Sequence, residues 1–353
     1  MALVHGVAPR TLRTLLASFG SPQALLEASR EEIERLAGER VAQAFVRGCD
    51  ARELERAVDW LSREGHDLIP LGDARYPPRL LEIPDPPAVL YVSGHADLLV
   101  RDGFAIVGSR NASPQAAADA YAFAHALSDA SLPIVSGLAL GIDSWAHRGG
   151  LAGASSSIAV MGTGPDGCYP RAHRALLAEI ERHGCAISEF PLGTPPRPGN
   201  FPRRNRLITG MSLGVLVVEA GLPSGSLTTA RHALEQGREV FAMPGSIHSP
   251  HAKGCHWLIK QGAKLVEEAN DVLEELRLPS RARPLVPSAP PVERAHADDA
   301  LLRTMAHGPM SMDQLARHSG LASAALAARM TQLELEGRIS ALPGGMYQRI
   351  ERP

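Results

Sequence analysis

The chain has 353 residues, and its 36 basic and 38 acidic residues give a formal net charge of −2. This balance argues against a protein that coats duplex DNA through bulk charge, although it leaves room for a local basic groove. The length exceeds what one hydrophobic core usually serves, so two or three domains are expected.

The four cysteines lie far apart and form no C-x-x-C pair, so neither a zinc site nor a disulfide framework is predicted. The opening residues, MALVHGVAPRTL, lack the basic start and long apolar run of a secretory signal. No apolar run has the length needed to span a bilayer. We therefore expect a soluble protein of the reducing cytoplasm, without a membrane partner.

Residues 1–66 are predicted to form a small helical domain of the SAM or helix-hairpin-helix kind. The segments PRTLRTLLASFG, SPQALLEASREEIERLAG and ERVAQAFVRG carry apolar residues at helical spacing, and each ends in glycine. Such bundles bind partners or nucleic acid in some proteins and only pack against the main domain in others. The residues leave both roles open.

Residues 67–277 are predicted to form the central domain. From about residue 104, short apolar runs such as FAIVGS and LGVLVVEA alternate with amphipathic helical stretches. Continuous apolar runs are typical of strands buried on both faces of a parallel sheet. The alternation predicts an α/β fold with a Rossmann-like, doubly wound parallel sheet. Because ligands of such sheets bind beyond the carboxyl ends of the strands, the following loops are the places to look for function.

The C-terminal part is predicted to hold a linker and a third domain. Residues 278–296 are rich in proline and indicate an extended linker. Residues 297–353 contain three helical segments and a hairpin, in the order of a winged helix. The helix that would read DNA, 322–336, ends in Glu334 and Glu336, so we favour protein contact or packing over DNA recognition.

The first strand of the central domain leads into VGSRNASP. Gly108 permits close approach to the backbone, Ser109 offers a hydroxyl, and Arg110 can hold a phosphate with two hydrogen bonds. Ser113 and Pro114 then form a typical helix start. Taken alone, this stretch is better explained by an ordinary turn with a solvated arginine.

The next two loops give weaker signals. SGLALGID, 136–143, has glycines that suit a backbone-amide cradle, and Asp143 is expected to cap the helix that follows. GTGPDG, 162–167, formally matches G-x-G-x-x-G, but Pro165 delays the helix start. We therefore predict a wider loop here and not a dinucleotide-binding turn.

The most unusual stretch is GTPPRPGNFPRRNRLITG, 193–210. It holds four arginines in ten positions (Arg197, Arg203, Arg204 and Arg206) together with Phe201. Cations near a helix start oppose the helix dipole, so their clustering needs a reason. Arginines beside an aromatic ring suit a single nucleic-acid strand, because the charges follow the phosphates and the ring stacks on a base. The alternative is a solvated helix end with some arginines paired to acids, and we rank it lower.

The loop EAGLPSGSLTTARHA, 219–233, places several hydroxyl groups around a predicted helix start. Free backbone amides and hydroxyls together make an anion site, to which Ser226 and Thr229 would contribute. The chain has no G-x-x-x-x-G-K-[ST] or H-E-x-x-H motif, so no P-loop, metal or cofactor is expected.

These loops in this order resemble the DNA-processing protein A family (DprA, also called Smf). The matching segments are YPPRLLEIPDPPAVLYVSG, AIVGSR, VSGLALGIDSWAHRGGL, GTGPDGCYP, SEFPLG, FPRRNRLITGMS, VVEAGLPSGSLTTARHALEQGREVFAMPG and KGCHWLIKQGA. The resemblance covers roughly residues 70 to 277.

The resemblance implies a homodimer that binds single-stranded DNA and loads RecA recombinase onto strands coated by single-strand-binding protein, during natural transformation. It implies DNA recombination without enzymatic activity. Its strand-binding positions fall on two triplets: Gly108, Ser109 and Arg110, then Arg204, Asn205 and Arg206. We add four residues on physical grounds: Phe201, Arg203, Ser226 and Thr229.

Two other functions remain open. One is a Rossmann-type hydrolase of nucleoside monophosphates, for which Glu189 and Glu219 are the plausible acids. The extended arginine stretch suits a longer chain better than a single nucleotide. The other is a duplex-binding regulator that acts through residues 297–350, which the acidic end of the presumed recognition helix makes less favourable.

Overall fold

The computed structural model describes residues 3–4, 6–279, 301–302, 305, 309–342 and 344–350. The N-terminal segment is helical, and its helices are α1 (Pro9–Phe19), α2 (Pro22–Glu27), α3 (Arg30–Ala37), α4 (Glu39–Arg47) and α5 (Ala51–Leu61). The segment predicted as one helix over 21–38 is divided into α2 and α3, and α5 had not been singled out. Side chains of Ser21, Ser29 and Asp50 cap three of them. Leu15, Leu25 and other apolar side chains close a small core of their own.

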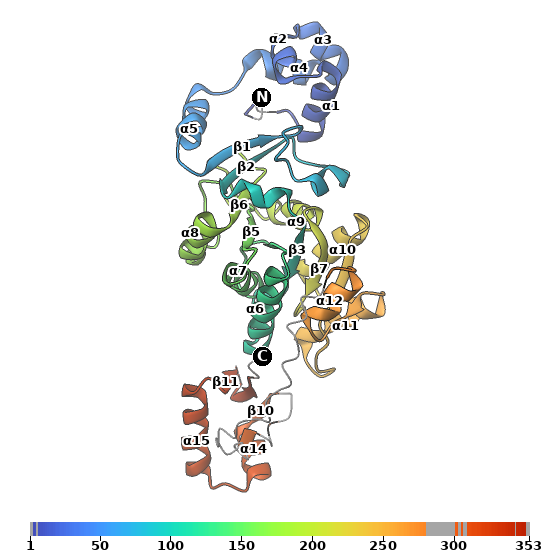
Figure 1. Cartoon of the computed structure of the whole chain (residues 1–353). Coiled ribbons are helices and arrows are strands. Elements are labelled where there is room, and N and C mark those ends of the chain that lie inside the picture. Colours follow the sequence, from blue (N-terminus) through green and yellow to red (C-terminus); the bar gives the residue numbers. More distant parts are fainter. Residues whose placement is uncertain are drawn as a thin grey trace.

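The centre of the molecule is a nine-stranded sheet with the order β1-β2-β6-β5-β4-β3-β7-β8-β9 (Figure 1). The strands are β1 (His66–Pro70), β2 (Val89–Gly94), β3 (Gly103–Val107), β4 (Ile134–Ser136), β5 (Ser157–Val160), β6 (Cys185–Ser188), β7 (Ser212–Val217), β8 (Glu239–Ala242) and β9 (Lys264–Leu265). From β6 to β9 all neighbours are parallel. The α/β class and the mainly parallel sheet are thus confirmed.

One edge of the sheet differs from the parallel prediction. β1 pairs with β2, and β2 with β6, in the antiparallel direction. An antiparallel edge on an otherwise parallel sheet is common, because an edge strand needs only one partner. This edge joins the sheet to the N-terminal helices.

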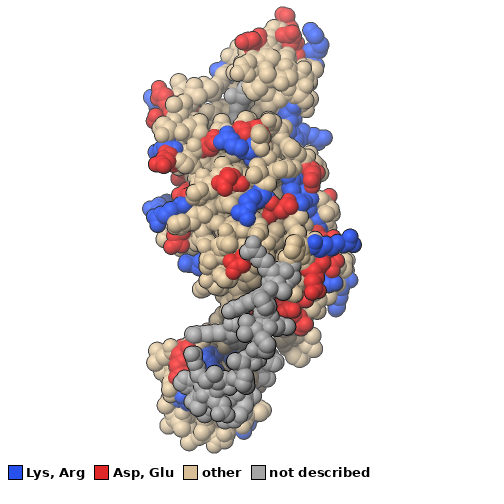
Figure 2. All heavy atoms as spheres, viewed as in Figure 1, with Lys and Arg blue, Asp and Glu red and all other residues tan. Residues whose placement is uncertain are grey.

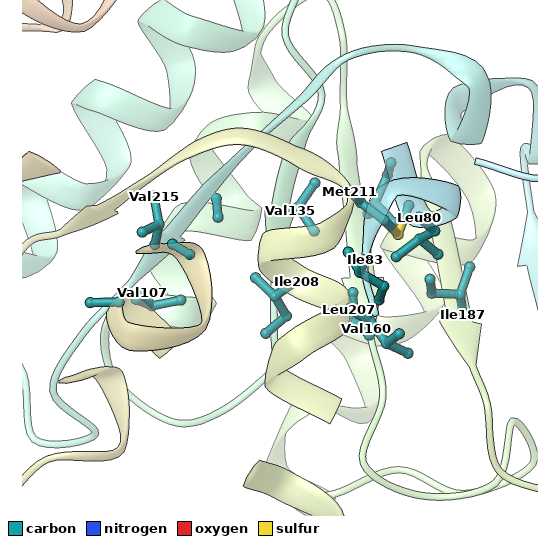
Figure 3. Packing of buried hydrophobic residues seen from close by; sticks show 14 of the residues in the cluster. Leu80, Ile83, Val107, Val135, Val160, Ile187, Leu207, Ile208, Met211 and Val215 are labelled. Atoms are coloured by element: carbon teal, nitrogen blue, oxygen red, sulfur yellow. The ribbon is translucent and has the colours of Figure 1, made fainter. Parts of the chain in front are cut away.

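Helices cover both faces of the sheet, as a doubly wound fold requires. One face packs against α6 (Pro114–Asp129), α7 (Ile142–Ala152), α8 (Arg174–His183) and α12 (Ala269–Glu275). The other packs against α9 (Asn200–Gly210), α10 (Gly225–Glu235) and α11 (Lys253–Lys260). In Figure 3, Leu207 and Ile208 of α9 lie between Val160 and Ile83 on one side and Val107 on the other.

The strand order reverses between β3 and β7. From β3 the chain moves outward through β4, β5 and β6, and then returns to the other side through β7, β8 and β9. The loops after β3 and β7 therefore leave in opposite directions and open a crevice at the carboxyl ends of the strands.

The C-terminal module has the elements expected of a winged helix. Helices α14 (Met312–Ser319) and α15 (Ser323–Leu335) pack with a three-stranded sheet of β10 (Met310–Ser311), β12 (Met346–Arg349) and β11 (Ile339–Leu342). Most of the predicted linker, 278–296, and most of the helix predicted at the start of this module lie outside the described residues.

Within the described ranges, none of the helices combines the length and apolarity required to cross a bilayer. The same residues contain no group of three or more His, Cys, Asp or Glu side chains able to hold a metal ion. On the face seen in Figure 2, basic and acidic side chains are interspersed. This face therefore carries no continuous basic surface.

Candidate nucleic-acid interface

An open pocket of about 470 Å³ occupies the crevice between the loops that follow β3 and β7. Eight of the ten predicted site residues line it: Gly108, Ser109, Arg110, Phe201, Arg204, Asn205, Ser226 and Thr229. The two that do not are Arg203 and Arg206. The pocket thus gathers predicted residues as far apart in sequence as Gly108 and Thr229 at the switch point of the sheet.

The turn after β3 is held rigidly. The amide of Ser109 donates to the Glu219 carbonyl at 2.7 Å, and the Ser109 carbonyl accepts from the amide of Ile142 at 3.1 Å. Gly141 has φ 75°, and a Cβ there would lie 2.1 Å from the Ser109 carbonyl oxygen. Only glycine allows α7 to begin this close to the turn.

Arg110 is the exposed cation of this turn. Among the described residues its side chain has neither an ion pair nor a hydrogen bond. A guanidinium at the rim of a pocket, on a backbone fixed from both sides, is preorganised to bind a phosphate.

Arg204 is built into the floor of the pocket. Its Nη1 donates to the carbonyl oxygens of Gly137, at 2.5 Å, and of Val160. Gly137 directly follows β4 and Val160 ends β5, so one guanidinium joins the ends of two neighbouring strands. A Cβ on Gly137 would lie 2.6 Å from Cζ of Arg204, so the arginine lies directly against the bare backbone. Its Nε donates to Asn205 Oδ1 at 3.2 Å.

Burial lowers the pKa of Arg204 to about 10, a shift that the nearby Asp143 carboxylate opposes. The guanidinium therefore stays charged at neutral pH. Burial raises the pKa of Asp143, and Arg204 acts in the opposite direction. The expectation that Asp143 caps α7 is wrong: Gly141 is the N-cap. The carboxylate instead accepts from the Gly137 and Ala139 amides at 3.0 and 3.3 Å, and so fixes the loop that Arg204 touches.

Arg203 and Arg206 share one carboxylate. Their Nη2 atoms lie 2.9 and 2.6 Å from Oε2 of Glu189, whose side chain is only 1% exposed. Arg206 also donates to the Asp85 carbonyl at 2.6 Å. This pairing offsets the repulsion that three cations near a helix start would otherwise cause. Arg203 and Arg206 thus form ion pairs with an acid, the alternative that the sequence analysis ranked below DNA binding. Their contact with DNA stays a prediction.

The two candidate acids of a hydrolase are both committed to structural contacts. Glu189 is paired with Arg203 and Arg206 as described. Glu219, which is buried, accepts from the amide of Ser113 at 2.9 Å through Oε2. Ser113 in turn caps α6, as predicted. Neither carboxylate lines the pocket.

The far wall of the pocket is the start of α10. Ser224 is the N-cap, and its hydroxyl lies 2.7 Å from that of Ser226. Thr229 Oγ1 donates weakly to the Gly225 carbonyl at 3.4 Å. The first amides of a helix carry partial positive charge, which adds to that of Arg110 and Arg204. The pocket can therefore hold an anion by several donors at once.

Phe201 has more neighbours than the sequence suggested. A Cβ on Gly162 would lie 2.7 Å from the Phe201 ring, and the ring centroid lies 5.4 Å from that of Tyr169. The ring therefore rests on backbone while it still lines the pocket.

Sequence reasoning missed several lining residues, including Asn111, Ala139 and His251. His251 comes from the segment after β8, next to β7 in the sheet. Its carbonyl accepts from the Ala220 amide at 2.9 Å. The sequence could have indicated His251, because β7 and β8 are parallel neighbours and the loops that follow them lie at the same edge of the sheet.

Two histidines hold the loop under the pocket. Leu138 has the left-handed φ of 58°, unusual for a branched residue. Its amide donates to His147 Nε2 at 3.2 Å, and its carbonyl lies 3.0 Å from His173 Nδ1. Nδ1 of His147 lies 2.7 Å from Ser157 Oγ. Burial lowers the pKa of His147 to about 3, with Arg204 and His173 adding to the shift. The neutral imidazole is thus part of the fold.

Comparison with known proteins decides the family. The model of DNA recombination-mediator protein A matches residues 67–277, and that of the DprA winged helix domain matches residues 286–345. The chain belongs to the DNA recombination-mediator protein A family. The resemblance inferred from the loops is confirmed, and so is the winged-helix class of the C-terminal module.

Relatives in this family align over most of their length. Protein Smf of Escherichia coli (strain K12) is 43% identical over 319 residues, which are 89% of this chain and 85% of Smf. DNA processing protein DprA of Streptococcus pneumoniae is 46% identical over 203 residues, 58% of this chain and 72% of that protein.

Two solved structures share the fold. The X-ray structure of DprA from Streptococcus pneumoniae superposes with a TM-score of 0.69 at 37% identity, covering 76% of this chain and 94% of that one. DNA processing protein A from Helicobacter pylori, described for its unique single-stranded DNA binding mode, gives 0.55 at 28% identity, covering 60% and 95%.

Proposed function

We propose that this protein binds single-stranded DNA in the pocket at the β3/β7 switch point. The observation that carries the proposal is the convergence there of unpaired Arg110, buried Arg204, the hydroxyls of Ser226 and Thr229 and the start of α10. Each supplies a donor or positive charge for a phosphate, and Phe201 supplies a ring for a base. The Helicobacter pylori relative, described as a single-strand binder, supports this assignment.

An unpaired strand suits this site better than a duplex or a mononucleotide. The pocket is open, so a chain can pass through it. On the face seen in Figure 2, acidic and basic groups are interspersed, so that face offers little attraction for a duplex backbone. We infer that the site catalyses no reaction, because Glu189 and Glu219 hold structural partners outside the pocket. A panel of nucleoside monophosphates should therefore release no free base.

Arg110 is the best probe of the proposal. We expect Arg110→Ala to weaken binding of an oligothymidylate and to reduce the slope of log K against log salt by about 0.7, since one phosphate contact is lost. Fluorescence anisotropy over a salt titration measures both quantities. Arg47→Ala, which removes an exposed arginine at the end of α4, is the matched control and should bind like wild type.

An unchanged affinity and an unchanged slope for Arg110→Ala would rule out phosphate binding at this turn. Arg204 and Arg206 are less suitable for this test. Arg204 is buried and Arg206 is largely buried in its ion pair with Glu189, so their replacement would change the fold as well as the charge.

We further propose the role that the family resemblance suggests: a cytoplasmic homodimer that delivers transforming DNA to RecA recombinase when single-strand-binding protein covers the strand. RecA alone should then fail to exchange SSB-coated strands, and addition of this protein should restore exchange. Arg110→Ala should restore much less. If wild-type protein binds the strand and leaves the RecA reaction unchanged, the binding proposal stands and the loading proposal fails.

A further inference from the structure

Tyr169 extends the aromatic wall of the pocket beyond its edge. It lies in the loop between β5 and α8, and its side chain is 50% exposed. Its ring centroid is 5.4 Å from that of Phe201, with 43° between the ring planes. Phe201 lines the pocket and Tyr169 does not, so the two rings lead from the pocket to the surface.

Both rings are held in place from behind. Phe201 rests on Gly162, where a Cβ would approach the ring to 2.7 Å. Tyr169 packs on Phe201 at a spacing typical of interacting aromatic pairs. Its hydroxyl has no hydrogen-bond partner within the described part of the chain. The ring is thus fixed on one side and open on the other.

Two arginines follow Tyr169 closely in the chain. Arg171 and Arg174 follow it on the same segment, and both are exposed. Neither forms an ion pair with any residue that the structure describes. An open aromatic ring followed by unpaired arginines is the arrangement that single-strand binders use, in which bases stack while cations follow the backbone.

We propose that the exposed face of Tyr169 stacks on a nucleobase just outside the pocket. The DNA strand would then run from the pocket past Phe201 and Tyr169 toward Arg171. This subsite rests on the proposed single-strand binding. It adds a base contact that is insensitive to sequence, because every base has a face that can stack.

The test compares an oligothymidylate with an abasic oligonucleotide of equal length and charge. We expect Tyr169→Ala to weaken binding of the oligothymidylate about tenfold, with the salt slope unchanged, because a base contact and no phosphate contact is lost. Tyr169→Phe keeps the ring and should bind within about twofold of wild type. On the abasic strand, wild type and Tyr169→Ala should bind equally. Tyr121→Ala, an exposed tyrosine on α6, is the matched control.

The outcomes separate this proposal from the general one. If Tyr169→Ala binds oligothymidylate like wild type while Arg110→Ala binds more weakly, the proposed stacking on Tyr169 is wrong and the proposed binding in the pocket is supported. An equal loss on the abasic strand would mean that Tyr169 only supports the loop, which also overturns the proposal. If wild type binds neither strand, the proposed function itself fails.

Discussion

Replacing Arg204 with methionine is expected to lower the free energy of unfolding of the central domain by about 3 kcal/mol, because two buried carbonyl groups lose their donor. Gly137 directly follows β4 and Val160 ends β5, and Arg204 Nη1 binds both carbonyls. Arg204 is 4% exposed, so water cannot readily replace it. Asp143 would also lose the charge that opposes its desolvation. Chemical denaturation followed by circular dichroism measures the loss.

Two variants test the cause of this effect. Arg203→Met removes a half-exposed arginine from the same helix and should cost less than about 1 kcal/mol, because the buried Glu189 carboxylate keeps its ion pair with Arg206. Asp143→Asn in the Arg204→Met background should recover part of the stability, since a buried carboxylate without a cation is removed. If Arg204→Met is as stable as Arg203→Met, the pairing with the strand ends contributes nothing.

The order of strands and helices in the central domain was predictable because each strand is apolar on both faces and each helix has one polar face. β3, β4 and β7 are the clearest examples: their residues are almost all buried. β1 was not predicted, since HDLIP mixes polar and apolar residues and its burial is partial. An edge strand has one exposed side, which weakens the pattern that identifies it.

The arginine segment shows where sequence reasoning stopped. The clustering of arginines identified the segment, and the resemblance placed it in the site. Neither told which arginine lines the pocket and which are paired with an acid. Helical spacing could have done so. Arg203 and Arg206 stand three residues apart and share a face, where one carboxylate reaches both. Arg204 stands three and four residues before Leu207 and Ile208, which face the core (Figure 3). Glu189 could not be assigned as the partner, because β6 and α9 are brought together only by the fold.

The stability of the protein is expected to fall on acidification because of His147. Folding lowers the pKa of this imidazole from its ordinary value of 6.5 to about 3, since it is buried beside Arg204 and His173. Below pH 6.5 the unfolded chain binds a proton that the folded chain excludes. The contribution to stability is complete above pH 6.5 and decreases by about 1.4 kcal/mol for each pH unit below it, until the pH approaches the folded pKa.

His147→Gln removes this titration and should flatten the dependence of stability on pH. The variant is less stable at pH 7, because the Leu138 amide and Ser157 hydroxyl lose their partner. Between pH 6.5 and 4.5 the stability gap between wild type and variant should shrink by about 2 to 3 kcal/mol. Carboxylates titrate in both proteins, so they cancel in this difference. His147→Ala should show the same flattened slope at still lower stability, since it cannot titrate either. If the difference in unfolding free energy between wild type and variant stays constant with pH, the imidazole takes up its proton in the folded state as readily as in the unfolded state. The hydrogen bond between His147 and the Leu138 amide would then be accessible to water.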